Sequence, residues 1–323
     1  MARDIAVIGG SAGSLDVLST IARGLPGDLP ATLFVVMHTS PQGESLLPEL
    51  LSRRSALPAV HAIDGEPIVP GRIYVAPPDH HLLVYPHHVR VTRGPKENRH
   101  RPAVDPLFRS AARAYGKRVI GVVVSGGLDD GTAGLGAVKQ AGGLALVQDP
   151  EEAVARGMPS HAIKHVAVDR IVRAHEIAPA IVAEALAPVS PELPPVPIAP
   201  DQPGPEPGEP SGERSVYSCP DCGGVLVESR EGGLHRFRCN VGHALSPESL
   251  LEGQQSTLEY ALWEALRVLG ERAVLLRRLG ARTRGSPATS AHFDDQAADA
   301  ERRAGLVRQA LMDMTARGKQ TPG

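Results

Sequence analysis

Apolar and polar residues along the first half of the chain form a pattern that predicts strands and helices in alternation. Short apolar runs of strand length are separated by stretches whose apolar residues recur every three or four positions. The predicted strands are 4–9, 32–38, 58–62, 72–76, 119–125, 143–147 and 165–168, and the predicted helices are 14–24, 43–55, 104–116, 131–141, 159–164 and 174–186. Such alternation is typical of a doubly wound α/β fold with a mostly parallel sheet.

The segment 82–92 has a different pattern. Apolar residues alternate with polar ones on both sides of Pro86-His87-His88. A period of two around a turn predicts an antiparallel β-hairpin.

The second half of the chain divides by composition. Residues 187–215 are so rich in proline, with so few large apolar residues, that they predict a disordered linker. Residues 216–247 form a small module that holds all three cysteines. Residues 248–317 are predicted to be helical, with Leu262, Leu269 and Leu276 spaced by seven, and Gly285-Ser286-Pro287 interrupts them. We therefore expect an antiparallel helical hairpin or a short coiled coil.

Composition excludes several classes of function. The chain has 323 residues, 42% of them hydrophobic, and a formal net charge of −2. This charge gives no electrostatic basis for binding nucleic acid or an anionic membrane surface. No stretch approaches the roughly 20 apolar residues of a membrane span, and the N-terminus does not resemble a signal peptide. We expect a cytoplasmic protein without membrane insertion.

Three candidate catalytic residues follow three predicted strands. Ser11 lies in a glycine-rich turn directly after the strand 4–9, His38 ends the strand 32–38, and Asp130 follows the strand 119–125. Carboxyl ends of parallel strands form the edge where α/β sheets place their sites. A serine hydroxyl needs a base, a carboxylate that orients the base, and N–H donors for the oxyanion. The three residues suit the first three roles, and the turn after Ser11 suits the fourth.

Other interpretations of these residues stay open from spacing alone. The serine turn is also compatible with a phosphate-binding turn or a plain strand-to-helix connection, although Ser14 replaces the third glycine of a dinucleotide fingerprint. His38 is also compatible with a packed strand-end residue, and Asp129 and Asp130 with a helix cap. An α/β-hydrolase fits poorly, because that fold orders its triad Ser, Asp, His.

Six motifs in order make the first half of the chain similar to a known family. They are IGGSAG at 8–13, VVMH at 35–38, GRIYVAPP at 71–78, NRHRPAVD at 98–105, SGGLDDG at 125–131 and GMP at 157–159. Together they resemble the catalytic domain of chemotaxis-type protein-glutamate methylesterases, the CheB family, over about residues 4–185.

The resemblance implies a three-layer α/β/α fold, hydrolysis of glutamate γ-methyl esters on receptor helices, and often deamidation of glutamine. By position it implies Ser11 as nucleophile, His38 as base and Asp130, not Asp129, as the triad carboxylate. His100 and Arg101 lie in a motif beside the family's active site, so they are candidates for lining the substrate groove; a structural ion pair is the alternative for Arg101.

The chain departs from the family at three points. Members commonly have Thr where this chain has Ala12, and often Met where it has Gly127. The prototype enzyme of the family also carries an N-terminal phosphoacceptor receiver domain, whereas this chain begins at the catalytic strand. We therefore expect no activation by phosphorylation within the chain.

The cysteines have the spacing of a zinc site. Cys219 and Cys222 are separated by two residues, and Cys239 and His243 by three, which gives a Cys₃His set suited to tetrahedral zinc. The set is closed, so we expect the metal to be structural, with none needed for catalysis. The alternatives are His235 as a substitute ligand and a metal-free loop with reduced cysteines.

The leading hypothesis is that residues 1–186 form a Ser-His-Asp esterase that acts on a methylated chemoreceptor or a similar helical signalling protein. One alternative is a signalling scaffold that retains the esterase shell, and another is a small-molecule serine esterase. The C-terminal helices are candidates for self-association, for docking on a receptor, or for covering the active site.

Overall fold

The structure is a computed structural model that describes residues 2–187, 212–231, 233–283 and 286–318. It contains two compact units, residues 1–250 and 251–323. The predicted linker 187–215 lies mostly outside the described residues.

A seven-stranded parallel sheet forms the centre of the first unit, in the order β3-β4-β2-β1-β7-β8-β9. Its strands are β1 Ile5–Gly10, β2 Thr32–Met37, β3 Ala59–His61, β4 Ile73–Val75, β7 Val119–Val123, β8 Leu144–Gln148 and β9 Arg170–Val172. The predicted parallel, doubly wound sheet is confirmed.

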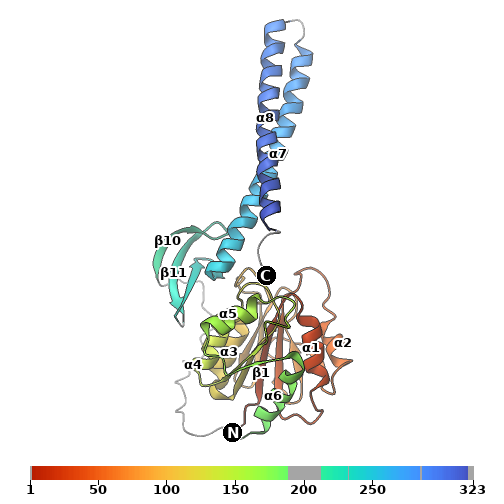
Figure 1. Cartoon of the computed structure of the whole chain (residues 1–323), viewed down its shortest axis with the longest axis vertical. Coiled ribbons are helices and arrows are strands. Elements are labelled where there is room, and N and C mark those ends of the chain that lie inside the picture. Colours follow the sequence, from red (N-terminus) through yellow and green to blue (C-terminus); the bar gives the residue numbers. More distant parts are fainter. Residues whose placement is uncertain (1, 188–211, 232, 284–285, 319–323) are drawn as a thin grey trace. The chain divides into compact units, whose positions relative to one another are not determined.

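Helices cover both faces of this sheet, which gives three layers (Figure 1). One layer consists of α1 Ser14–Arg23, α2 Leu47–Ser52 and α6 Ala174–Leu186, and the other of α3 Val104–Tyr115, α4 Thr132–Gln140 and α5 Gly157–His165. Each face has its own core because side chains alternate along the strands: Ala6 and Ile8 enter one core, and Val7 enters the other.

The antiparallel hairpin is confirmed. Strands β5 His81–Tyr85 and β6 His88–Thr92 pair antiparallel as a separate two-stranded sheet. Its turn places His87 at φ 68°.

Two predicted elements differ from the structure. The predicted strand 165–168 is wrong: this segment ends α5 and connects it to β9, whose residues Arg170 and Ile171 are exposed at the sheet edge. Val166 and Val168 gave the apolar signal because they pack on the core from the connection. The helix predicted at 43–55 is limited to α2, because Gly43 (φ 108°) interrupts the approach to it.

The order of the strands brings the candidate residues together. Strand β1 is central, with β2 on one side and β7 on the other. In this sheet, β2, β3 and β4 lie on one side of β1, and β7, β8 and β9 lie on the other. The strand order therefore reverses at β1, and the carboxyl ends of β1, β2 and β7 meet there. Ser11, His38 and the loop with Asp130 follow these three ends.

The cysteine-bearing segment forms a small antiparallel sheet within the first unit. Its strands are β10 Glu213–Ser218, β11 Val225–Glu231, β12 Leu234–Cys239 and β13 Ala244–Leu245, in sequence order. The core of this sheet has six buried residues, two of which are Cys219 and Cys239. So small a core needs additional stabilisation.

The second unit is helical. Helix α7 Pro247–Arg282 enters it, and α8 Pro287–Gly318 packs antiparallel on α7. Ala273, Leu276 and Ala300 are buried between the helices, and Arg277 pairs with Glu301 at 2.8 Å. Within the described ranges, no helix combines the length and the apolarity that a membrane span requires.

Candidate active site

Glycines place Ser11 at the end of β1. A Cβ on Gly9 would lie 2.1 Å from the side chain of Val104, so the glycine lets the start of α3 approach the strand. Gly13 has φ 75° and turns the chain into α1. The Ser11 amide donates to the Ser125 carbonyl at 2.9 Å, and this bond fixes the turn to the loop after β7.

The three candidate residues form a continuous chain of hydrogen bonds. His38 Nδ1 lies 3.1 Å from Ser11 Oγ, and His38 Nε2 lies 2.7 Å from Asp130 Oδ2. With the Nε2 proton donated to the carboxylate, Nδ1 is the free base that faces the serine hydroxyl. The His38 and Asp130 side chains are only 7% and 2% exposed, so water competes little for these bonds.

Asp130 is held as a carboxylate by its donors. Besides His38, it accepts hydrogen bonds from Asn98 Nδ2 at 2.9 Å and from the backbone amides of Val104 and Asp105 at 2.7 and 3.2 Å. The two amides belong to the first turn of α3, where a helix favours an anion. Burial alone would raise the pKa of Asp130, but the bonds from His38, Val104 and Asn98 hold it well below its ordinary value.

The adjacent Asp129 does not touch His38. Its Oδ1 accepts a hydrogen bond from Ser246 Oγ at 2.8 Å. Burial raises the pKa of Asp129 from 3.8 to about 6, and the neighbouring acids Asp105 and Glu248 act in the same direction. The structure therefore places Asp130, and not Asp129, against the imidazole.

We expect Asp129→Asn to stabilise the chain at neutral pH. A carboxyl whose folded pKa is raised destabilises the folded state increasingly as pH rises from about 4 through about 6. The variant removes this cost, so its free energy of unfolding should exceed that of the unmodified chain by about 1 to 3 kcal/mol at pH 7. Urea unfolding at pH 3.5 and 7 measures the difference; an equal gain at both pH values would contradict the assignment.

His100 and Arg101 have different surroundings. The His100 ring stacks on His38, with centroids 3.7 Å apart and planes 16° from parallel. Burial lowers the pKa of His100 to about 4, so the ring against the base is neutral at pH 7. The Arg101 guanidinium instead pairs with Asp79 at 2.6 Å and donates to the Gly94 carbonyl at 2.7 Å. This is the structural ion pair that the sequence left open as its alternative.

A second glycine, Gly126, lies directly against Ser11. A Cβ on Gly126 would lie 2.0 Å from Met158 Sδ and 3.0 Å from Ser11 Cβ. Met158, from the GMP motif, is fully buried at this point. Ser11 therefore lies against a surface that has no room for a further side chain.

Gly126→Ala should displace Ser11 and lower kcat about 10- to 100-fold, because a shift of about 1 Å in a reacting group is that costly. Gly127→Ala is the matched control, since a Cβ there meets nothing within 4 Å. Turnover numbers of the two variants provide the comparison, and equal activity would show that the contact under Ser11 is unimportant.

The turn after Ser11 presents unused donors. In the described part of the chain, the amides of Ala12 and Gly13 have no hydrogen-bond acceptor, and both residues are exposed. They are available for an oxyanion beside Ser11.

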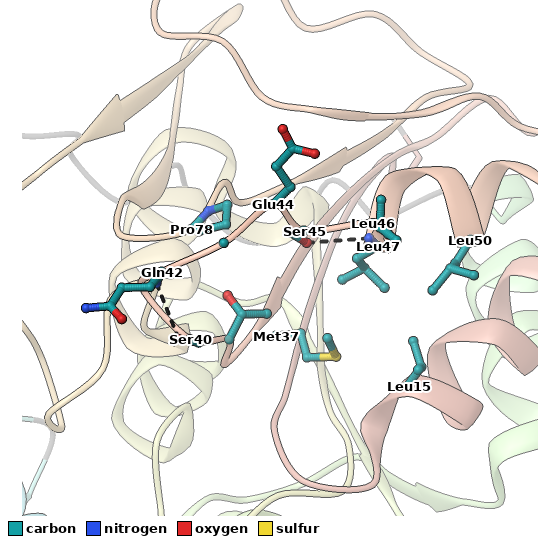
Figure 2. Close-up of a pocket in the computed structure, with 12 residues that line it drawn as sticks. Leu15, Met37, Ser40, Gln42, Glu44, Ser45, Leu46, Leu47, Leu50 and Pro78 are labelled. Atoms are coloured by element: carbon teal, nitrogen blue, oxygen red, sulfur yellow. Dashed lines mark hydrogen bonds between the residues drawn. The ribbon is translucent and has the colours of Figure 1, made fainter.

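A groove of about 230 Å³ lies along the residues that flank His38 in sequence. Met37 and Thr39 line it, and Figure 2 shows Leu15, Met37 and Leu50 facing the same hollow. Leu15 and Leu50 are 40% and 39% exposed. Ser11, His38 and Asp130 lie outside its lining, which also includes the polar residues Ser40, Gln42 and Glu44.

Known proteins resemble the part of the chain that carries this site. Residues 6–181 match the family model described as CheB methylesterase. The chain belongs to the CheB methylesterase family. It is 34% identical to the crystal structure of the Thermotoga maritima CheB methylesterase catalytic domain, with a TM-score of 0.55; the match covers 57% of this chain and 99% of that one.

Curated relatives in the CheB family carry two activities in their names. A protein-glutamate methylesterase/protein-glutamine glutaminase of Anaeromyxobacter dehalogenans is 38% identical over 54% of this chain and 49% of its own length. One from Xanthomonas campestris is 37% identical over 54% of this chain and 50% of its own length. The chain thus spans about half the length of the curated relatives it matches.

The cysteine module lies outside the range matched to the CheB family. Its four candidate ligand atoms, from Cys219, Cys222, Cys239 and His243, all lie within 4.8 Å of one another. The Cys222–Cys239 sulfur separation is 3.6 Å, and His243 Nδ1 lies 3.7 and 3.6 Å from Cys219 and Cys239. A tetrahedron with bonds of about 2.3 Å has edges of about 3.7 Å, so the donor set fits zinc.

His235 is not part of this cluster. Its Nδ1 lies 2.7 Å from Glu228 Oε1 across the sheet.

Several residues that hold Asp130 in place were not predicted from the sequence. The motif at 98–105 directed attention to His100 and Arg101, but it is Asn98 whose amide bonds to Asp130. Val104 and Asp105 contribute through backbone amides, which no side-chain pattern reveals. The only sequence signal was that a polar segment precedes a helix within a family motif.

Proposed function

We propose that the chain is a protein-glutamate methylesterase in which Ser11 is the nucleophile, His38 the general base and Asp130 the residue that orients His38. The observation that carries the proposal is the continuous chain of hydrogen bonds, 3.1 Å from Ser11 to His38 and 2.7 Å from His38 to Asp130. Family membership and the names of the relatives support the choice of a glutamyl ester over other esters.

In the first half of the reaction, Ser11 Oγ attacks the γ-carbonyl carbon of the methylated glutamate while His38 Nδ1 takes the hydroxyl proton. Negative charge forms on the carbonyl oxygen, where the amides of Ala12 and Gly13 can donate to it. Asp130 stabilises the imidazolium that results. The bond to the methoxy group then breaks, His38 gives its proton to the leaving oxygen, and methanol departs.

In the second half, His38 removes a proton from water, and the water oxygen attacks the acyl carbon. The bond to Ser11 Oγ breaks, and His38 returns the proton to the serine. The product is a free glutamate. A glutamine side chain follows the same course with ammonia as the leaving group, which accounts for a deamidase side activity.

We propose a methylated chemoreceptor or a similar helical signalling protein as the substrate. A helix that carries the ester side chain to Ser11 would place neighbouring apolar residues near Leu15, Met37 and Leu50. An apolar groove beside the reacting group is the usual way to recognise an amphipathic helix.

A panel of three substrates separates the competing functions. The full chain is incubated with a methylated receptor fragment, with the same fragment carrying glutamine, and with a short-chain acyl ester, and methanol, ammonia or acid release is measured. We expect fast methanol release, slower ammonia release and little cleavage of the acyl ester. Preference for the acyl ester would favour a small-molecule esterase, and no turnover of any substrate would favour a scaffold.

We also propose structural zinc at Cys219, Cys222, Cys239 and His243. The spacing of the donor atoms and the small core of the module support this assignment. Three thiolate ligands need a reducing compartment, so a cytoplasmic location is the matching expectation. Purified chain should contain one zinc per molecule, and Cys222→Ser should lower that content; an unchanged metal content would contradict the assignment.

Exposed apolar residues on α7 favour a second role for the helical unit, in self-association or docking. Leu258, Trp263 and Leu275 are 53%, 55% and 57% exposed. Sedimentation of the full chain with and without Leu258→Ser and Leu275→Ser tests self-association, which should weaken in the double variant.

A further inference from the structure

The cysteine module packs directly on the segment that holds the catalytic aspartate. The Ala244 carbonyl accepts a hydrogen bond from the backbone N–H of Asn98 at 2.7 Å, and the backbone N–H of Ala244 donates to the Lys96 carbonyl at 3.2 Å. A Cβ on Gly242 would lie 2.9 Å from Pro95. Strand β13 and the loop before it are thus joined by backbone hydrogen bonds to the segment before α3.

Arg236, from strand β12 of the module, reaches into the interior of the catalytic domain. Its side chain is 3% exposed. Nη1 donates to Asn98 Oδ1 at 2.9 Å and lies 3.3 Å from Asp105 Oδ2, while Nη2 lies 3.3 Å from Glu97 Oε2. The partners of Nη1 and Nη2 replace the water that these nitrogens lose on burial, which makes the contact specific. Among the described residues Nε has no hydrogen-bond partner, and the Glu231 carboxylate lies 3.9 Å from it.

The side-chain amide of Asn98 links Arg236 to Asp130. Its Oδ1 accepts from Arg236 Nη1 and from the Ser246 amide at 3.2 Å. Its Nδ2 donates to Asp105 Oδ2 and to Asp130 Oδ1, both at 2.9 Å. The two donors from the module hold the oxygen end of the amide, and the two carboxylates hold its NH₂ end, so the module adds to the forces that keep Nδ2 on Asp130.

Arg236 also compensates buried acids next to the triad. Glu97 and Asp105 are buried beside Asp130, and Arg109 pairs with Glu97 at 2.6 Å. Although burial alone would raise the pKa of Glu97, Arg109 and Arg236 lower it to about 2. Asp105 in turn accepts the amides of Gly131 and Gly134 at 3.1 and 2.7 Å, so its position sets that of the loop that carries Asp130.

We propose that Arg236 is a positioning residue of the active site, and that the cysteine module, through Arg236 and Asn98, orients Asp130 and makes esterase activity depend on the folded, metal-bound module. The inference rests on the proposed esterase function. It goes beyond that function because it assigns a role to the cysteine module, which lies outside residues 6–181, the range matched to the family.

Two arginine variants of the full chain test the role of Arg236. Arg236→Met keeps the length of the side chain but removes the charge and the donors. Arg230→Met is the matched control, since Arg230 is exposed on β11 of the same sheet. We expect Arg236→Met to lower the rate of Ser11 labelling by a fluorophosphonate, and kcat for the methyl ester, about 10- to 100-fold with KM little changed. Arg230→Met should react like the unmodified chain.

A spectroscopic readout separates positioning from general damage. The proton on His38 Nε2, which lies 2.7 Å from Asp130 Oδ2, should give a low-field ¹H resonance that does not require turnover. This resonance should move in Arg236→Met, stay in place in Arg230→Met, and return toward its original position in Arg236→Lys, which restores the charge. Because it does not depend on methyl-ester cleavage, it tests the inference even if the proposed substrate is wrong.

Metal removal tests the same coupling without a mutation. Chelation of the unmodified full chain, followed by zinc, should abolish and then restore both the labelling rate and the position of the His38 resonance. The inference is overturned if Arg236→Met matches Arg230→Met in both readouts. It is equally overturned if the metal-free chain keeps its labelling rate and its resonance.

Discussion

Ser11→Ala is expected to reduce methanol release from a methylated receptor by on the order of 10⁶-fold. The hydroxyl that His38 Nδ1 faces at 3.1 Å would be gone, and no acyl intermediate could form. Binding should persist, because the groove beside His38 is unchanged. Methanol production under substrate saturation measures the loss, and circular dichroism checks that the fold is kept.

Ser19→Ala provides a control, because Ser19 lies on α1, the helix that follows Ser11, and is only partly buried. It should retain full activity. Methanol release by Ser11→Ala at the rate of this control would contradict the assignment of the nucleophile.

Asp130→Asn is expected to lower kcat about 10⁴-fold while the chain stays folded. An asparagine in this position can direct its NH₂ group at His38 Nε2, which then must accept a hydrogen bond. The ring proton moves to Nδ1, the atom that must take the serine proton, and the base is lost. KM should change little, because Asp130 is 2% exposed and does not meet the substrate.

The adjacent carboxylate supplies the control for this variant. Asp129→Asn removes the same charge one residue away, where the side chain bonds to Ser246 and not to His38. Its activity should stay within a few-fold of the unmodified chain. Equal losses in the two variants would mean that charge at this loop matters and the orientation of His38 does not.

Sequence periodicity predicted the fold of the catalytic part well, because buried parallel strands read as apolar runs and their helices as amphipathic stretches. It misplaced the last strand, since β9 lies at the sheet edge with Arg170 and Ile171 exposed. The apolar residues Val166 and Val168 that suggested a strand pack on the core from a connection. Residues of an edge strand are often exposed, so an edge strand need not form the apolar run by which a buried strand is predicted.

The proximity of Ser11, His38 and Asp130 could be predicted because each lies at the end of an apolar run and in a family motif. The residues that hold these three side chains in place could not be predicted. Asn98 was inside a motif but was passed over, and Arg236 belongs to a different sheet, 138 positions further along the chain. Contacts of that kind depend on how two modules pack, which no local spacing records. The candidate catalytic residues could be predicted from the sequence. The residues that hold them in place could be identified only from the structure.

Ser11 carries the reaction in the proposed mechanism, and covalent labelling tests this role most directly. The full chain is treated with one equivalent of a fluorophosphonate, the modified residue is located by peptide mass spectrometry, and methanol release is measured on the same sample. We predict that the label lies on Ser11 and that methanol release falls in proportion to the labelled fraction. A label on another residue, or undiminished methanol release from fully labelled chain, would contradict the account.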